Sequence, residues 1–181
     1  PLKILHRSDR KDWFKAWILV CSCPGSRAVH VELMSGQDSN SLKMAFDRFV
    51  DRRGLVRHFI SDNGGNFLGL KGVFEGIYGK EEMDEVSDHL LRRYGVSWRT
   101  YAPRAPWCGG FIERMVGLVK QGLSRWTLQT PSSTFEQMSS LLCLVEAALN
   151  DRPLTAPSSD ARDARPLSPS ALLHPLRHSA I

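Results

Sequence analysis

Two short stretches of the sequence carry the side chains that could do chemistry. In the first, Ile60 to Phe67, Asp62 follows a short apolar strand expected over Val56 to Ile60 and is followed by Asn63-Gly64-Gly65. Glycines there let the backbone bend sharply and leave the carboxylate uncovered. A carboxylate at the end of a strand suits a hard cation such as Mg²⁺. The same residue types are common in simple hairpin turns, so Asp62 alone decides nothing.

The second stretch is an expected helix from about Phe111 to Leu128, after an irregular loop rich in proline and glycine at residues 103–110. Glu113 then falls in the first turn, where the helix dipole favours a carboxylate. Lys120 lies two turns further along the same face, with Gly117 between them. This face presents an acidic side chain, a glycine and a basic side chain. The arrangement suits a metal ion at one end and a phosphate at the other. Glu113 by itself is also explained as an ordinary acid near a helix N-terminus.

The elements that must position these residues follow an α/β order. An apolar run from Lys15 to Cys23 predicts a buried strand, and Arg27 to Met34 predicts its hairpin partner. Apolar residues at helical spacing predict a helix over Ser39 to Arg53, ended by Gly54. The other expected elements are a strand end at 2–5, an irregular loop at 68–82, a helix at 84–94 closed by Gly95, a strand at 96–100, a helix at 135–149 after a capping box of Ser133 and Glu136, and a helical turn within 167–173.

The expected strand at residues 27–34 carries two polar side chains on one face. His30 and Glu32 alternate with apolar residues, so the two sets point to opposite faces. We expect a solvated or half-covered polar face there, in preference to a metal-binding pair.

The composition suits one domain with a sizeable core: the chain has 181 residues, of which 42% are hydrophobic and 24% charged. The net charge is +5, and 17 arginines against 7 lysines favour a polyanionic partner. The four cysteines fit no zinc-binding spacing, and we expect reduced thiols in an intracellular protein. The sequence has no signal peptide and no apolar run that could span a bilayer, so we expect no membrane partner.

Together, the two chemical stretches resemble the integrase core of LTR retrotransposons, most closely the Pao/BEL branch. Three further stretches agree with that branch, and all five follow in order over nearly the whole chain. One such motif is weak, whereas five in order are specific. The stretches are Ser26 to Leu33, Phe46 to Gly54, Ile60 to Phe67, Ala105 to Val116, and Leu149 to Thr155 with Pro166 to Pro169.

The resemblance implies an α/β, RNase H-like fold: a mixed sheet, with an antiparallel hairpin plus parallel strands, flanked by helices and lacking part of its first strand. We expect residues 1–152 to form the catalytic core and residues 153–181 a Pro/Ser-rich C-terminal extension. The implied function is DNA integration by divalent-metal-dependent polynucleotidyl transfer. In such integrases, element DNA undergoes 3′-end processing and strand transfer into host DNA, so the parent polyprotein would supply a DNA nucleotidyltransferase and endonuclease.

The resemblance also assigns roles to individual residues. It implies a triad of Asp, Asp and Glu that holds two Mg²⁺ or Mn²⁺ ions, with Asp62 as the second acid and Glu113 as the third. Lys120 matches a basic position that contacts the DNA end, and Asn63 and Arg114 are expected to bind DNA as well. Carboxylates suit this chemistry because Mg²⁺ prefers hard oxygen ligands.

The first acid of the triad is missing from the sequence. Pro1-Leu2 resembles the end of a Gly-Pro-Leu-like segment that follows this acid in the family, so we expect the acid just upstream and an inactive 181-residue fragment. Asp9 and Asp12 are poor substitutes, because we expect them in a charged turn after the first strand. The interval between the other two acids is longer than in the retroviral branch, with an expected insert at residues 69–84.

The expected partners are element-end and host target DNA and further copies of the chain. The protein would act in the nucleus and otherwise lie in a cytoplasmic particle. The apolar face of the helix at 135–149 suits either a contact between copies or packing on the sheet.

A second hypothesis is an element-derived DNA-binding or assembly module without catalysis, and a third is an RNase H-fold nuclease with another substrate. The retained Asp62, Asn63, Glu113 and Lys120 favour the integrase, and the C-terminal motifs disfavour the third hypothesis.

Overall fold

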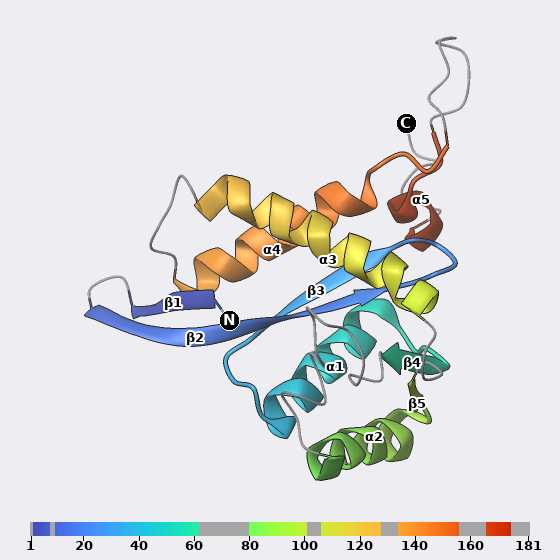
Figure 1. The fold of residues 1–181 in the computed structure, drawn as a ribbon, viewed down its shortest axis with the longest axis horizontal. Helices are drawn as coiled ribbons and strands as arrows, with labels where there is room; N and C mark the ends of the chain where they lie inside the picture. Colours follow the sequence, from blue (N-terminus) through green and yellow to red (C-terminus); the bar gives the residue numbers. More distant parts are fainter. Residues whose placement is uncertain are drawn as a thin grey trace. The chain divides into compact units, whose positions relative to one another are not determined.

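The computed structural model describes residues 2–7, 10–61, 80–100, 106–127, 134–155 and 166–174. Figure 1 shows the order of its elements: β1 (Leu2–Arg7), β2 (Arg10–Ser22), β3 (Val29–Met34), α1 (Ser39–Arg53), β4 (His58–Ser61), α2 (Lys80–Tyr94), β5 (Ser97–Thr100), α3 (Pro106–Thr127), α4 (Phe135–Asn150) and α5 (Pro169–Leu173). One sheet has the order β1-β2-β3 and a second pairs β4 with β5. The chain divides into two compact units: the first includes Glu32–Phe111, and the second includes Val20–Val31 and the chain from Ile112 onward.

In the first unit, α1 has the bounds that the sequence predicts. Gly54 ends the helix with a φ of 83°, and its N–H donates to the Val50 carbonyl oxygen at 2.8 Å. The apolar face of α1 is buried and contributes Phe46 to an aromatic cluster, in which its ring centroid lies 4.6 Å from Phe59 on β4 and 5.2 Å from Trp98 on β5. These contacts fix α1 against one face of the β4-β5 pair.

The β4 and β5 strands are parallel, and their register pairs His58 with Ser97 and Ser61 with Thr100. Both strands therefore end at the same edge of this small sheet. β4 begins two residues later than the sequence predicts. It ends at Ser61, immediately before position 62. The Trp98 indole N–H donates to Ser61 Oγ at 3.0 Å, which ties the last residue of β4 to β5.

The N-terminus of α1 is held by Asp38, whose carboxylate accepts from the Ser41 N–H at 2.9 Å and the Ser41 hydroxyl at 2.7 Å. The Ser41 hydrogen bonds lower the pKa of the Asp38 carboxyl. A Cβ added at Gly36 would collide with this carboxylate and lie 2.8 Å from Ser41 Oγ. The cap therefore requires glycine two residues before it.

We expect Asp38→Ala to lower the free energy of unfolding by about 1 kcal/mol at pH 7, the usual loss for an N-cap. Because the folded-state pKa of Asp38 lies below its ordinary value, the cap stabilises at neutral pH and is lost as the pH falls through about 4 and below. Urea unfolding at pH 7 and pH 3 measures the difference between parent and variant. If the free energies of unfolding of parent and variant differed equally at both pH values, the role of the ionised carboxylate would be contradicted.

In the second unit, α4 covers the outer edge of β3. The Asn150 side chain accepts from the Val29 N–H and donates to the Val29 carbonyl oxygen, both at 2.8 Å. One turn earlier, Glu146 accepts from the Val31 N–H at 2.8 Å and lies 3.3 Å from His30 Nδ1. Two side chains of a helix thus take the place of a further strand along this edge.

The polar face expected on β3 is buried, and this expectation is wrong. His30 is 3% exposed and Glu32 is 5% exposed. In the second unit His30 lies against Glu146, and in the first unit Glu32 binds Arg48 and Arg52 of α1. Charged partners from distant parts of the chain make the burial possible, because a buried charge needs an opposite charge or hydrogen bonds.

The long helix α3 begins at Pro106, whereas the sequence predicts a loop at residues 106–110. Proline is favoured at the first position of a helix, because its missing N–H would have no partner there. Gly109 and Gly110 are then tolerated in the first turns. Glu113 therefore lies two turns inside the helix, and the expected stabilisation by the helix N-terminus does not apply to it.

Two other expectations, about where α2 and β2 begin, are wrong. α2 begins at Lys80, so residues 80–82 are helical, while the rest of that expected loop lies outside the described residues. β2 begins at Arg10, so Asp12 lies in a strand and not in a turn; Asp9 is not among the described residues. β2 neighbours β1 in the sheet, and this pairing explains why the strand starts so early.

The capping box of α4 is one residue further on than the sequence predicts. Thr134 Oγ1 accepts from the Gln137 N–H at 3.2 Å, and Gln137 Oε1 accepts from the Thr134 N–H at 2.9 Å. This pair replaces the expected Ser133 and Glu136, since glutamine completes the box as well as glutamate does. In the described part of the chain no helix has the length and apolarity to cross a membrane.

Candidate active-site helix and nucleic-acid interface

The second unit presents one face of α3 to solvent and buries the other. Met115, Val119 and Leu123 are buried at a spacing of four residues. Glu113 and Lys120 are both exposed, as is Gly117 between them. Seven residues correspond to about 10 Å along a helix, so the acid and the base share one face two turns apart, as the sequence predicts.

The glycines of α3 fall into two kinds. A Cβ at Gly122 would lie 3.0 Å from a methyl group of Val145, so close packing of α3 on α4 explains that glycine. A Cβ at Gly110 or Gly117 would meet no described atom within 4 Å. A helix-interior glycine costs about 1 kcal/mol relative to alanine. Internal packing therefore does not account for Gly117. Close approach of the backbone of a bound molecule to the exposed face would account for it.

Glu113 offers a carboxylate that is open to solvent. No hydrogen bond or ion pair joins it to another residue in the described part of the chain. Arg114 and Lys120 are likewise exposed. The face can therefore present an oxygen ligand and a cation to an approaching molecule without first breaking an ion pair among these residues.

Asp62 and Asn63 lie outside the described residues, so their predicted roles stay predictions. The structure does describe how the chain reaches them. β4 ends at Ser61, one residue before Asp62, and the chain that leads on to α3 leaves β5 at Thr100, the partner of Ser61 in the parallel pair. The edge of a parallel sheet where strands end is where ligand-binding residues commonly lie.

The described ranges contain no group of three or more His, Cys, Asp and Glu side chains that could hold a metal ion. The chemistry of the available donors nevertheless fits Mg²⁺ or Mn²⁺. The exposed Glu113 carboxylate provides hard oxygen atoms, and Asp62 would provide the same. That Asp62 and Glu113 bind an ion together stays a prediction.

Arg152, which follows α4, joins three elements of the second unit. Its Nη2 donates to the carbonyl oxygen of Arg27 at 2.6 Å and lies 3.7 Å from Met115 Sδ, while Nη1 donates to the carbonyl oxygen of Leu149. Partial burial, and then the nearby positive charges of Arg114 and Arg27, lower the pKa of the Arg152 guanidinium. Arg152 therefore joins the β2-β3 turn, α3 and the last turn of α4 within the second unit.

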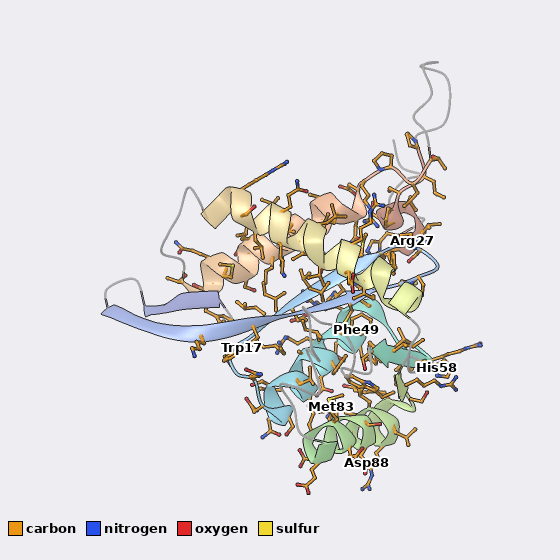
Figure 2. The ribbon with its side chains drawn as sticks, viewed as in Figure 1. Trp17, Arg27, Phe49, His58, Met83 and Asp88 are labelled. Atoms are coloured by element: carbon orange, nitrogen blue, oxygen red, sulfur yellow. The ribbon has the colours of Figure 1, made fainter. Side chains whose placement is uncertain are left out.

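Arg27 occupies an unusual backbone position. It lies in the turn between β2 and β3 (Figure 2), is exposed, and has a φ of 59°, in the left-handed region that favours glycine or asparagine. It is the only non-glycine residue in the described part of the chain with a positive φ. Arg27 and Arg152 are not among the functional residues that the sequence predicts. Both lie in stretches that resemble the integrase motifs, and the excess of arginine was the available signal.

The apolar face of α4 is mostly used inside the second unit. Met138, Leu141, Leu142 and Val145 are buried, whereas Leu144 is 63% exposed. A shallow groove of about 390 Å³ runs between α3 and α4, which run in opposite directions (Figure 1). Packing inside the unit therefore accounts for most of the face, and the surface left for another copy is the strip around Leu144.

No protein-family model matches the chain. One curated relative is the Pol polyprotein of Feline endogenous virus ECE1, which is 28% identical over 102 residues. That match covers 56% of this chain and 8% of the polyprotein, so the chain corresponds to a small part of the relative's length.

The fold resembles three solved structures. A chain of the simian T-cell lymphotropic virus intasome in complex with PP2A regulatory subunit B56 gamma has a TM-score of 0.60 at 16% identity; the match covers 94% of this chain and 52% of that one. The HTLV-2 integrase catalytic core domain in complex with magnesium, in a trimeric form, has a TM-score of 0.57 at 19% identity. The match covers 89% of this chain and 86% of that one. The BIV integrase catalytic core domain has a TM-score of 0.58 at 19% identity, and the match covers 94% of this chain and 93% of that one.

The chain is therefore an α/β domain with the RNase H-like fold of retroviral integrase catalytic cores, as the sequence predicts. Together with the Pol polyprotein match, this fold supports an integrase-like domain of a retroelement and confirms that resemblance. The closer similarity to the Pao/BEL branch, and the division at residue 152, stay predictions.

Proposed function

We propose that this chain is the catalytic core of a retrotransposon integrase, whose parent protein joins element DNA to host DNA by divalent-metal-dependent polynucleotidyl transfer. The observation that carries the proposal is the exposed face of α3, on which Glu113 and Lys120 flank the uncovered Gly117. This face belongs to a chain with the fold of integrase cores, in which β4 leads directly into Asp62.

In this proposal Asp62 and Glu113 would hold the metal ions, together with a third acid. Bound there, the ions would activate a water or a DNA 3′-hydroxyl for in-line attack on a phosphodiester and stabilise the leaving oxygen. Lys120 would contact backbone phosphate, and Asn63 and Arg114 would add further contacts. Such contacts position DNA without reading its sequence.

The proposed partners are the DNA ends of the element, host target DNA and other copies of the chain, with action in the nucleus and otherwise in a cytoplasmic particle. The net charge of +5 supports a polyanionic partner. The exposed Leu144 on α4 supports a contact between copies in the second unit.

The test compares the 181-residue chain with a chain that is extended at its N-terminus to carry a third acid. We expect Mg²⁺-dependent processing and strand transfer of a labelled DNA end from the longer chain and little from the shorter one, because two ions need a third flanking carboxylate. Chelation by EDTA should abolish the activity. Strong activity of the 181-residue chain would instead place the first acid within it.

The second candidate is a DNA-binding or assembly module without catalysis. It shares the fold and the basic surface, so DNA binding alone does not separate the two. If the longer chain bound DNA but transferred no strand with either Mg²⁺ or Mn²⁺, the module would be the better description and the integrase proposal would fail.

A further inference from the structure

Two side-chain hydrogen bonds cross the parallel pair of β4 and β5, one at each end. At the start of the strands, the exposed His58 ring (Figure 2) bonds through Nδ1 to Ser97 Oγ at 2.6 Å. At the end, the Trp98 indole N–H donates to Ser61 Oγ at 3.0 Å, and Ser61 is joined directly to Asp62 in the chain. We propose that this second bond makes Trp98 a positioning residue for Asp62. The inference deepens the proposed function and rests on it, since it takes Asp62 to be a metal ligand.

The register of the two strands directs the indole toward the end of β4. Trp98 pairs with Phe59, and alternate residues of a strand share a face, so Ser61 is the next residue of β4 on the side of Phe59. The indole N–H reaches this diagonal neighbour. The hydrogen bond therefore ties the last residue of β4 to a residue of β5 that lies inside the pair.

Aromatic contacts hold the indole ring in place. Its centroid lies 5.2 Å from that of Phe46 on α1, with the rings at 83°, and 6.4 Å from that of Phe59. Phe59 in turn lies 5.1 Å from Phe49 of α1. Edge-to-face pairs at such distances are favourable. Because the ring is packed against a helix and a strand, its N–H has a fixed direction, and the Ser61 hydroxyl accepts from it.

A tie at this place affects more than the stability of the sheet. Each strand has four residues, and the pairing ends at Ser61 and Thr100. Successive Cα atoms are about 3.8 Å apart, so a displacement of Ser61 is passed on to the backbone of Asp62. Outer partners that orient metal ligands typically change metal affinity or activity by about 10- to 100-fold when they are mutated. The same range is expected for a residue that holds the strand end before a ligand.

The test separates the indole ring from its N–H. Trp98→Phe keeps an aromatic ring and removes the donor, and Ser61→Ala removes the acceptor. Ser61→Thr keeps a hydroxyl group in a residue type that favours strands. Ser97→Ala is the matched control, because it removes the hydrogen bond at the other end of the same pair.

The first measurement is hydrogen exchange in the 181-residue chain without metal. Amides that bond across the end of β4 should exchange about fivefold faster in Trp98→Phe and in Ser61→Ala, because one hydrogen bond is lost. Ser61→Thr should keep the parent rates, and Ser97→Ala should leave the end of β4 unchanged. If the exchange rates at the end of β4 were equal in the parent, Trp98→Phe and Ser61→Ala, the inference would be overturned, whatever the activity of the chain.

The second measurement is Mn²⁺ affinity without DNA, followed by electron paramagnetic resonance of the free ion, in a chain extended at its N-terminus to carry a third acid. Trp98→Phe and Ser61→Ala should each weaken binding about tenfold. The double variant should lose nothing further, because both changes remove one bond. Ser97→Ala and Ser61→Thr should bind as the parent does. In strand transfer, kcat should fall about tenfold in Trp98→Phe and Ser61→Ala, while KM for DNA stays unchanged.

A role in packing alone predicts a different result. Trp98→Phe removes ring atoms from the aromatic cluster, whereas Ser61→Ala removes one oxygen atom, so the melting temperature should fall further in the tryptophan variant. Metal affinity, measured well below both melting temperatures, should nevertheless fall alike in the two variants. If affinity followed the melting temperature, or if Ser97→Ala weakened it equally, Trp98 would serve only the stability of the sheet and the inference would fail.

The outcomes separate this inference from the proposed function. If Asp62→Asn abolishes Mn²⁺ binding while Trp98→Phe and Ser61→Ala keep the parent affinity, Asp62 is a ligand that needs no tie at Ser61, and only the inference fails. If Asp62→Asn keeps the parent affinity, Asp62 is not a ligand, and the proposed metal site fails together with the inference.

Discussion

Replacing Glu113 with glutamine is expected to lower strand transfer by about a thousandfold or more in a chain extended to carry all three acids of the proposed site. A metal site supplies several kcal/mol of transition-state stabilisation, and a neutral amide is a poor ligand for a hard cation. The fold should survive, because the Glu113 side chain is exposed and has no hydrogen bond or ion pair with another described residue. Gel-based strand transfer, with unfolding measured on the same samples, provides both readings.

Asp62→Asn should have the same effect, and the double variant should lose nothing further, because either change empties one shared site. Glu136→Gln is the matched control, since Glu136 is an exposed glutamate of α4 in the same unit. Binding of DNA in EDTA should not weaken in the Glu113 variant, because removing a negative charge beside phosphates does not oppose binding. Near-normal strand transfer by either single variant would show that its residue is not a metal ligand.

The largest loss of stability is expected at Asn150. This side chain is 4% exposed and makes both of its hydrogen bonds with Val29, so Asn150→Ala leaves a buried N–H and a buried carbonyl without these partners. An unsatisfied buried polar group costs about 1–3 kcal/mol, and the two together should lower the free energy of unfolding by about 3 kcal/mol. For a chain of this size the melting temperature should fall by roughly 10 °C.

The matched control for Asn150 is Asn40→Ala, because Asn40 is also a helical asparagine but is exposed. We expect that change to stay within about 0.5 kcal/mol of the parent. Differential scanning calorimetry of both variants tests the comparison. If Asn150→Ala were as mild as Asn40→Ala, the side chain of α4 would not stabilise the edge of β3 in solution.

Local sequence signals were sufficient for α1. Its apolar residues recur at helical spacing, and Gly54 alone supplies the left-handed conformation at its end, so both predicted bounds are confirmed. The start of α3 was mispredicted because proline and paired glycines indicate a loop locally, while proline is also favoured at the first position of a helix. Which of these uses applies depends on the elements on either side and not on the residue itself.

The environment of β3 depended on residues far away in the sequence. Alternation shows that His30 and Glu32 share a face, but it does not show what covers that face. Burial of these side chains required charged partners, which come from α4 for His30 and from α1 for Glu32. A pattern within one strand contains no information about such partners, so the prediction of a solvated face was wrong.

The sequence by itself determined the fold class, because five short motifs occur in order, and it determined that Glu113 and Lys120 share a helix face, because helical spacing is a local property. Only the tertiary structure showed that Arg152 joins the turn at Arg27 to Met115 of α3 in the second unit. Their positions in the sequence are far apart, and their meeting depends on how a hairpin turn, the first half of α3 and the end of α4 pack. Long-range packing decides that arrangement, and no spacing along the chain encodes it.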